Sequence, residues 1–299
     1  MAEMSRWSGT LTRIMDTLMS DFIRAVGQFE FMQFALLAVL LCSIACGVIG
    51  SYVVVRRISY IAGGISHSVL GGLGAAKYLQ QVQGWTWLDP FMGAVIAALL
   101  SAMIIGYVSL RAKQREDTVI GAIWAVGMAT GLLFIYKTPG YNEDLMRYLF
   151  GNPLMVSSPQ LQLLILLDVL IVGAGLLFYR QFQAVCFDEQ YSRLRGISVE
   201  FYYLMLLCLA ALTVVLLSMV VGIVLVIALL TLPAAIAGHF CRQLWSMMFV
   251  SVILSALLST GGLALSYTTD LPSGATIVVL CGAAYLITAA TSNWSRRQG

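Results

Sequence analysis

MQFALLAVLLCSIACGVIGSYVVV, residues 32–55, contains no charged side chain. A helix of about 20 apolar residues crosses the hydrocarbon core of a bilayer, so this stretch predicts a transmembrane helix. The rest of the chain has the same character, because 60% of its 299 residues are hydrophobic and only 10% are charged. Soluble domains carry about 25% charged residues. The apolar runs are continuous and do not alternate as barrel strands do. We therefore expect an all-α, polytopic transmembrane helical bundle.

Outward from this stretch, the sequence predicts eight or nine spans. The second predicted span is the least hydrophobic and Pro233 interrupts the seventh, so either of them is a candidate for a discontinuous helix. The nine ranges are 32–55, 58–79, 89–110, 118–136, 159–179, 199–218, 220–238, 244–266 and 273–291.

Lys and Arg concentrate in cytoplasmic loops, which orients the chain. If the link after the first span is cytoplasmic, eleven of the 17 basic residues fall inside: Arg56, Arg57, Arg111, Lys113, Arg115, Arg180, Arg193, Arg195, Arg242, Arg296 and Arg297. The N-terminus is then outside and the C-terminus cytoplasmic. We expect an external amphipathic segment lying on membrane lipid at residues 1–28, a transmembrane domain at 29–292 and a cytoplasmic tail at 293–299.

Several functional classes are excluded by missing motifs. The sequence has no G-x-x-x-x-G-K-[ST] loop, no H-E-x-x-H and no G-x-S-x-G, and it has only two histidines. We therefore do not expect the chain to be an enzyme, nor to hold a permanently bound cofactor. The net charge of +3 is small, and we expect no nucleic-acid partner.

GGISHSVLGG, residues 63–72, places polar and small residues inside the second span. Residues four apart share a helix face, so Gly63, His67 and Gly71 form one row, and Gly64, Ser68 and Gly72 form another. Small residues at this spacing let helix backbones approach closely in lipid. We therefore predict helix-packing roles for Gly64, Ser68, Gly71 and Gly72.

His67 lies ten residues after Arg57, about 15 Å along a helix and near the bilayer midplane. An ionisable residue at this depth is a functional-site hypothesis by default. His67 is either a ligand in a metal pathway, since neutral imidazole is a common ligand for transition metals, or a residue hydrogen-bonded to a neighbouring helix. Gly63, Ser66 and Asp168, the last in the fifth predicted span, are further candidates for the substrate pathway. For Asp168 we favour an interior hydrogen bond.

The polar link between the fifth and sixth predicted spans contains CFDEQYSRLRGIS. Phe187, Tyr191 and Leu194 fall on one helical face, and Asp188, Glu189, Arg193 and Arg195 lie elsewhere. A short amphipathic helix at the cytoplasmic surface is suited to docking a soluble partner. An ordinary solvated connector is the alternative.

Six stretches, in order over roughly residues 30–290, resemble permeases of the manganese/zinc/iron ABC transporter family. They are RRISYIAGGISHSVLGG (56–72), EDTVIGAIWAVGMATGLLFI (116–135), DLMRYLFGNPLMVS (144–157), FDEQYSRLRGI (187–197), VVGIVLVIALLTLPAAIA (220–237) and DLPSGATIVVL (270–280).

The resemblance implies a multi-pass permease subunit, in a bacterial inner membrane, of an ATP-driven importer of zinc, manganese or iron. The implied partners are a second permease protomer in a homodimer, cytoplasmic ATP-binding subunits that bind the ATP, and an external metal-binding protein. The implied ATPase-coupling segment comprises Phe187, Asp188, Glu189, Tyr191, Arg193, Leu194, Arg195 and Gly196. A stand-alone metal ion channel or secondary transporter is the alternative function.

One residue departs from the family pattern. The family pairs an aspartate with a histidine four residues later as metal ligands, and His67 matches the histidine, whereas Gly63 stands at the aspartate position. Gly71 replaces a family proline. Imidazole without a carboxylate favours Zn²⁺ over Mn²⁺. Alternatively, Gly63 leaves room for a ligand from another helix or from the second protomer.

Overall fold

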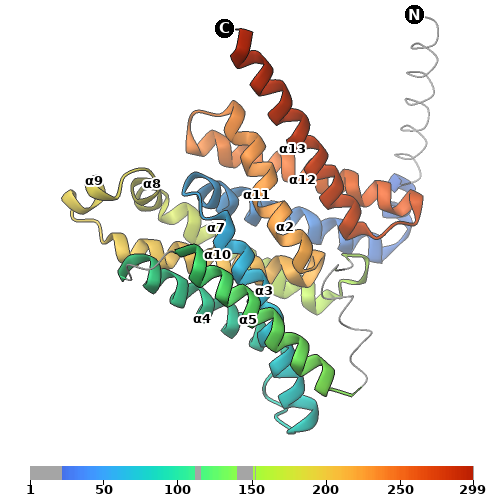
Figure 1. Ribbon diagram of the computed structural model, residues 1–299. Coiled ribbons are helices and arrows are strands. Elements are labelled where there is room, and N and C mark those ends of the chain that lie inside the picture. Colours follow the sequence, from blue (N-terminus) through green and yellow to red (C-terminus); the bar gives the residue numbers. More distant parts are fainter. Residues whose placement is uncertain (1–21, 112–115, 140–150, 152, 299) are drawn as a thin grey trace, which may run out of the picture.

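The computed structural model describes residues 22–111, 116–139, 151 and 153–298, and its elements are all helical (Figure 1). They are α2 (Glu30–Val55), α3 (Ser59–Val82), α4 (Pro90–Arg111), α5 (Glu116–Lys137), the 3-10 turn η1 (Pro153–Met155), α7 (Ser158–Leu177), α8 (Tyr179–Phe187), α9 (Glu189–Leu194), α10 (Val199–Val221), α11 (Ile223–Phe240), α12 (Leu244–Thr269) and α13 (Ser273–Gln298). The predicted all-α fold is confirmed.

Each of the nine predicted spans coincides with one long helix. By length and composition, seven of them are able to cross a membrane: α2, α4, α5, α7, α10, α12 and α13. α3 is not among the seven because glycine, serine and histidine dilute its apolar residues. α11, Ile223–Phe240, is apolar but short for a spanning helix, with 18 residues. Both helices are continuous, and Pro233 lies inside α11 without ending it. The count of eight or nine spans stays a prediction.

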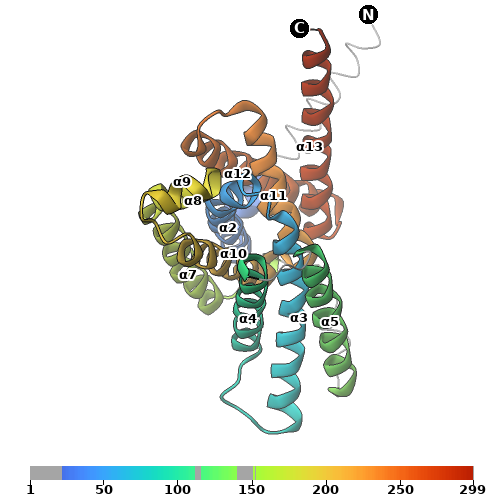
Figure 2. The ribbon, with the colours of Figure 1, turned by 60° about the vertical axis from the view of Figure 1, so that its left-hand side comes forward.

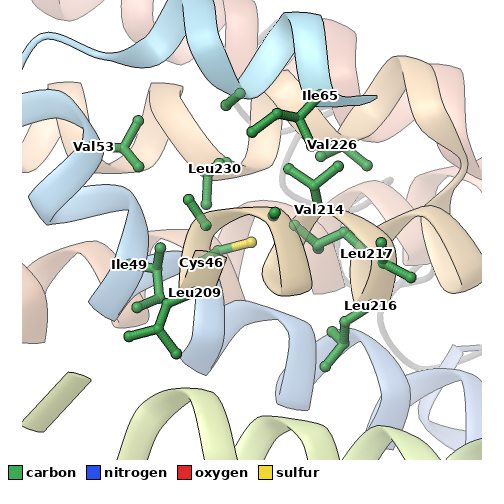
Figure 3. Packing of buried hydrophobic residues seen from close by; sticks show 14 of the residues in the cluster. Cys46, Ile49, Val53, Ile65, Leu209, Val214, Leu216, Leu217, Val226 and Leu230 are labelled. Atoms are coloured by element: carbon green, nitrogen blue, oxygen red, sulfur yellow. The ribbon is translucent and has the colours of Figure 1, made fainter. Parts of the chain in front are cut away.

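The centre of the bundle is α2, which packs against α7, α10, α11 and α12. Tyr52 near its end is fully buried, and its hydroxyl donates a hydrogen bond of 2.9 Å to the carbonyl of Gly175 on α7. Figure 3 shows the surrounding core, where side chains from four helices meet. The labelled residues are Cys46, Ile49 and Val53 of α2, Ile65 of α3, Leu209, Val214, Leu216 and Leu217 of α10, and Val226 and Leu230 of α11.

α3 lies between α4 and α5 (Figure 2). On the α4 side, Gly72 faces the carbonyl of Gly93 and the Cβ of Ala97 so closely that a Cβ has no room. On the α5 side, a Cβ at Gly71 would lie 2.8 Å from the carbonyl oxygen of Gly127. A Cβ at Gly64 would lie 2.8 Å from Ile120 Cγ2. Glycine at these positions allows the backbones to touch, which is how helices pack in lipid.

The turn between α2 and α3 is tight. The Ile58 N–H donates to the carbonyl of Val53, and the Arg57 N–H donates to that of Val54, at 3.0 and 3.1 Å. This pair of hydrogen bonds is a Schellman motif. Arg57 has a φ of 62°, where glycine is the usual residue. The turn leaves only Arg56, Arg57 and Ile58 between the two helices, so α3 starts directly beside the end of α2.

Four links between helices meet at one end of the bundle. Side-chain contacts join Arg56 to Glu189, Ser109 to Tyr203, and Tyr179 to Trp245. These contacts gather the α2–α3 link, the end of α4, the α8–α9 region and the start of α12. The same links carry most of the basic residues assigned to the cytoplasm. The location of the two termini relative to the membrane stays a prediction.

The predicted terminal segments are described only in part. Residues 1–21 of the predicted amphipathic segment lie outside the described residues, whereas residues 22–28 are helical. Phe22 and Ala25 are buried against Met32, Leu263 and Ala264. At the other end, α13 runs without interruption past the predicted boundary at residue 293 to Gln298.

The contact between α3 and α4 predicts the effect of Gly72→Ala. The added methyl group must displace the Gly93 carbonyl or Ala97, and such overpacking costs about 1–3 kcal/mol. We expect a lower Tm for the purified protein in detergent. Gly173→Ala on α7 is the matched control, because a Cβ there meets nothing within 4 Å. A wild-type Tm for Gly72→Ala would contradict the close packing of these helices.

Candidate functional site

His67 lies on α3 and faces α5, where its imidazole stacks on the indole of Trp124. The ring centroids are 4.4 Å apart and the ring planes differ by 14°. The side chain is half-buried, and its Nδ1 atom is buried without a hydrogen-bond partner. Nε2 is therefore the ring nitrogen available to a ligand. A neutral imidazole held in this way is able to coordinate a transition-metal ion.

Gly63, one turn before His67, leaves room for the indole of Trp124 because it has no side chain. A Cβ at Gly63 would lie 3.2 Å from Cζ3 of Trp124 and 3.4 Å from Cδ1 of Ile227 on α11. Any larger side chain at this position therefore requires the indole to move. The space beside His67 at position 63 is filled by an aromatic ring and an aliphatic side chain.

The two serines that flank His67 are bonded within their own helix. Ser66 is buried and donates its hydroxyl hydrogen to the carbonyl of Ala62, at 2.7 Å. Ser68 donates to the carbonyl of Ile65, also at 2.7 Å. Such bonds satisfy a buried hydroxyl without a partner from another helix. Each oxygen keeps acceptor lone pairs, but imidazole is the only strong ligand in this stretch.

Asp168 lies on a different pair of helices. It is 5% exposed on α7, and one carboxyl oxygen, Oδ1, has no hydrogen-bond partner. Its electrostatic neighbours include Cys42 and Cys46, on α2. His67, by contrast, faces α5. Within the part of the chain that the structure describes, no group of three or more His, Cys, Asp or Glu side chains is arranged to hold a metal ion.

Trp124 was not among the site residues predicted from the sequence. It lies on α5 in the same row as Ile120, Gly127 and Gly131, the residues that contact α3. The four positions recur every three or four residues, so they share one face of a helix. The sequence signal for Trp124 is a large aromatic residue on the same helix face as two glycines.

The predicted coupling segment, residues 187–196, folds mainly as the short helix α9, which lies beside α8 at one edge of the bundle (Figure 1). The prediction of one helical face was wrong for Phe187, because this residue ends α8 and the extended backbone of Asp188 separates it from Tyr191 and Leu194. Asp188 caps α9, because its Oδ1 accepts a hydrogen bond of 2.9 Å from the Tyr191 N–H. Gly196 has a φ of 74° and follows the helix as its C-terminal turn. The exposed fractions of Phe187, Tyr191 and Leu194 are 63%, 49% and 87%. An apolar surface of three side chains is therefore open to a partner.

Arg56 connects this segment to the start of α3. Its guanidinium forms an ion pair with Glu189 of α9 and lies 5.3 Å from the ring centroid of Tyr203 on α10. Ser59, the first residue of α3, follows three residues later. The ion pair thus links α9 to the turn that precedes α3, the helix that carries His67.

The other charged residues of the segment are bound locally. Arg193 lies 3.9 Å from Glu200 in an exposed ion pair, and the Arg195 guanidinium lies 5.0 Å from the ring centroid of Tyr191. Beneath them, burial raises the pKa of the Cys186 thiol to about 12, although nearby Arg56 acts in the opposite direction. Cys186 is therefore an uncharged packing residue at neutral pH.

Comparison with known proteins gives concordant matches. A family model described as "ABC 3 transport family" matches residues 28–292. A protein of Chlamydia muridarum named "Probable metal transport system membrane protein" is 44% identical over 251 residues, 84% of this chain and 85% of its own length. The "Manganese transport system membrane protein MntC" of Listeria monocytogenes is 31% identical over 266 residues, 89% of this chain and 92% of its own length.

One solved structure supports the same grouping. "PsaBC from Streptococcus pneumoniae in complex with Fab" contains a chain that is 31% identical to this one, with a TM-score of 0.80. The match covers 90% of this chain and 95% of the other. Similarity at this level extends over nearly the whole helical bundle.

Proposed function

Because the chain belongs to the ABC 3 transport family and is a membrane permease of its metal importers, we propose that His67 lies on the ion pathway and that separate ATPase subunits drive transport. The observation that carries the proposal is the half-buried imidazole of His67 on α3, the helix that packs between α4 and α5. An ionisable side chain at that depth faces a pathway or another polar group, and its buried nitrogen has no partner. The proposed cargo is a divalent transition metal, and relatives are named for manganese transport.

A second permease protomer, in a homodimer, completes the proposed site. Two observations support this. The imidazole is half-buried in a single protomer, and the described residues bring no three-residue ligand group together. A symmetric pair brings the same surface of each copy together, so two His67 side chains would face a shared pathway. Each permease would then provide only part of the coordination of the ion.

The ATPase subunits would dock on the cytoplasmic end of the bundle. The exposed Phe187, Tyr191 and Leu194 provide an apolar contact there, and Arg56 joins α9 to the α2–α3 turn. ATP-driven movement of the partner would thereby shift α3 and change the access to His67. An external metal-binding protein would dock at the opposite end, where Trp85 and Trp87 are exposed in the α3–α4 loop.

The direct test of the proposed function is metal uptake by proteoliposomes that contain the permease and its ATPase subunits. Uptake of Zn²⁺, Mn²⁺ and Fe²⁺ is measured and compared. ATP is supplied on the side of the ATPase subunits, and the metal-loaded binding protein is supplied on the opposite side. We expect ATP-dependent uptake in the wild type and its loss in His67→Ala, because the imidazole ligand is gone. Asp168→Asn tests the second buried candidate in the same assay.

The outcomes separate the alternatives. Uptake that does not depend on ATP would contradict an ABC importer and favour a channel or a secondary transporter. ATP-dependent uptake that survives His67→Ala but is lost in Asp168→Asn would place the pathway at α7 instead.

The Arg56–Glu189 ion pair predicts a charge-swap result. Arg56→Glu and Glu189→Arg each place like charges together, so we expect each single variant to lose ATP-dependent uptake. The double variant restores opposite charges, and we expect it to recover part of the activity. Glu200→Gln, which removes the exposed pair with Arg193, is the control and should transport like the wild type, since exposed pairs contribute little. Equal loss in the double variant and both single variants would refute transmission through this pair.

A further inference from the structure

We infer that Trp124 is the positioning residue of His67 and that Trp124 and Gly63 together restrict the site to borderline, nitrogen-preferring divalent ions. The inference rests on the proposed function of His67 as a ligand. It assigns a role to Trp124, which lies on another helix and is not itself a ligand. The observations that carry it are the stacked rings, the buried Nδ1 and the filled space at Gly63.

The first step concerns the orientation of the imidazole. A metal-binding histidine normally donates its second ring N–H to a carboxylate, a carbonyl or water, which fixes the tautomer and the direction of the ring. The Nδ1 atom of His67 has no such partner in the described structure. The indole of Trp124 lies parallel to the ring instead, with 4.4 Å between the centroids. Stacking therefore sets the direction in which Nε2 faces.

The second step concerns charge. Coordination of a divalent ion draws electron density from the imidazole and makes the ring partly cationic. The face of an indole attracts such a ring, and the attraction is stronger where water is excluded. Tyr60 extends the same aromatic surface, with its ring centroid 5.9 Å from that of Trp124. Trp124 thus stabilises the metal-bound state of His67 more than the free state.

The third step concerns the atoms that are able to reach the ion. Position 63 lies one helical turn from His67 and on the same face. The six-membered ring of Trp124 and the end of Ile227 lie 3.2 and 3.4 Å from the place where a Cβ at position 63 would be, so a side chain there would press against the indole. Oxygen ligands suit hard ions such as Mn²⁺, whereas imidazole suits zinc, nickel and other borderline metals. Replacing a possible carboxylate by an aromatic ring therefore favours the second group.

The test uses the complete transporter with Trp124→Ala and Trp124→Phe. Loss of a group that orients a metal ligand typically costs 10–100-fold in metal affinity. For Trp124→Ala we expect the KM for Zn²⁺ to rise about 10-fold or more, with an unchanged maximal rate and a lower ratio of Zn²⁺ to Mn²⁺ uptake. Trp124→Phe retains a stacking ring and should stay close to the wild type. Gly121→Ala on the same helix is the control, since the nearest atom to its Cβ is 3.9 Å away.

A spectroscopic readout reports binding without transport. Co²⁺ is paramagnetic and quenches the fluorescence of an indole next to it. We expect Co²⁺ alone to quench part of the tryptophan emission of the purified complex. That part should be absent in Trp124→Phe, which lacks the reporting indole, and in His67→Ala, which lacks the ligand.

The outcomes distinguish this inference from the proposed function. If the wild type shows no ATP-dependent metal uptake, the proposed function itself fails. If His67→Ala abolishes uptake while Trp124→Ala matches the wild type in KM and in metal preference, only the role of Trp124 is overturned. Quenching that persists in Trp124→Phe places the ion away from this ring and overturns the inference. A wild type that prefers Mn²⁺ to Zn²⁺ overturns the assignment of the ion class. Each variant must keep the wild-type Tm. If Trp124→Ala unfolds, the Co²⁺ quenching of Trp124→Phe is the deciding measurement.

Discussion

The rest of the structure depends on the backbone contact between α3 and its two neighbours. Lipid offers no hydrophobic driving force for one apolar helix to join another, so close packing has to hold the bundle together. α3 is also not apolar enough to be one of the seven candidate spanning helices, because its middle contains glycine, serine and histidine, so exposing it to lipid is costly. Gly72 against Gly93 on one side, and Gly71 against Gly127 on the other, allow α4 and α5 to cover it. The same contacts fix the depth and the rotation of His67.

α3 is also connected to α9, at the edge of the bundle, through the turn that precedes it. The turn at Arg57 leaves almost no slack between α2 and α3, because its backbone hydrogen bonds close it tightly. Arg56 then ties this turn to Glu189 in α9, next to an exposed apolar surface. Arg56 is also the C-terminal capping residue of α2, so its ion pair with Glu189 links α9 to the turn that α2 and α3 share.

Much of the fold was predictable from the sequence, because the length and the apolar composition of a segment determine whether it forms a helix that spans a bilayer. The nine apolar ranges, the small residues around His67 and the exposed pair Tyr191 and Leu194 follow from composition and spacing along single helices. The break at Asp188, which places Phe187 on α8, did not follow from spacing. The stacking of Trp124 on His67 did not follow, because it joins residues on two helices and depends on their relative register. Likewise, Gly63 alone suggested an empty space, and only the packing of α5 and α11 shows what fills it. The continuity of α11 through Pro233 also depends on its neighbours rather than on local propensity.

The measurement that locates the transported ion most directly is an anomalous difference map of the assembled transporter crystallised with Zn²⁺ in an occluded state. If the ion binds at Nε2 of His67, a peak is expected at about 2.0–2.1 Å from this nitrogen, the usual distance between zinc and a histidine nitrogen. The Trp124 ring should still be stacked on the imidazole. A peak beside Asp168, Cys42 and Cys46, with His67 free of metal, would contradict binding at His67.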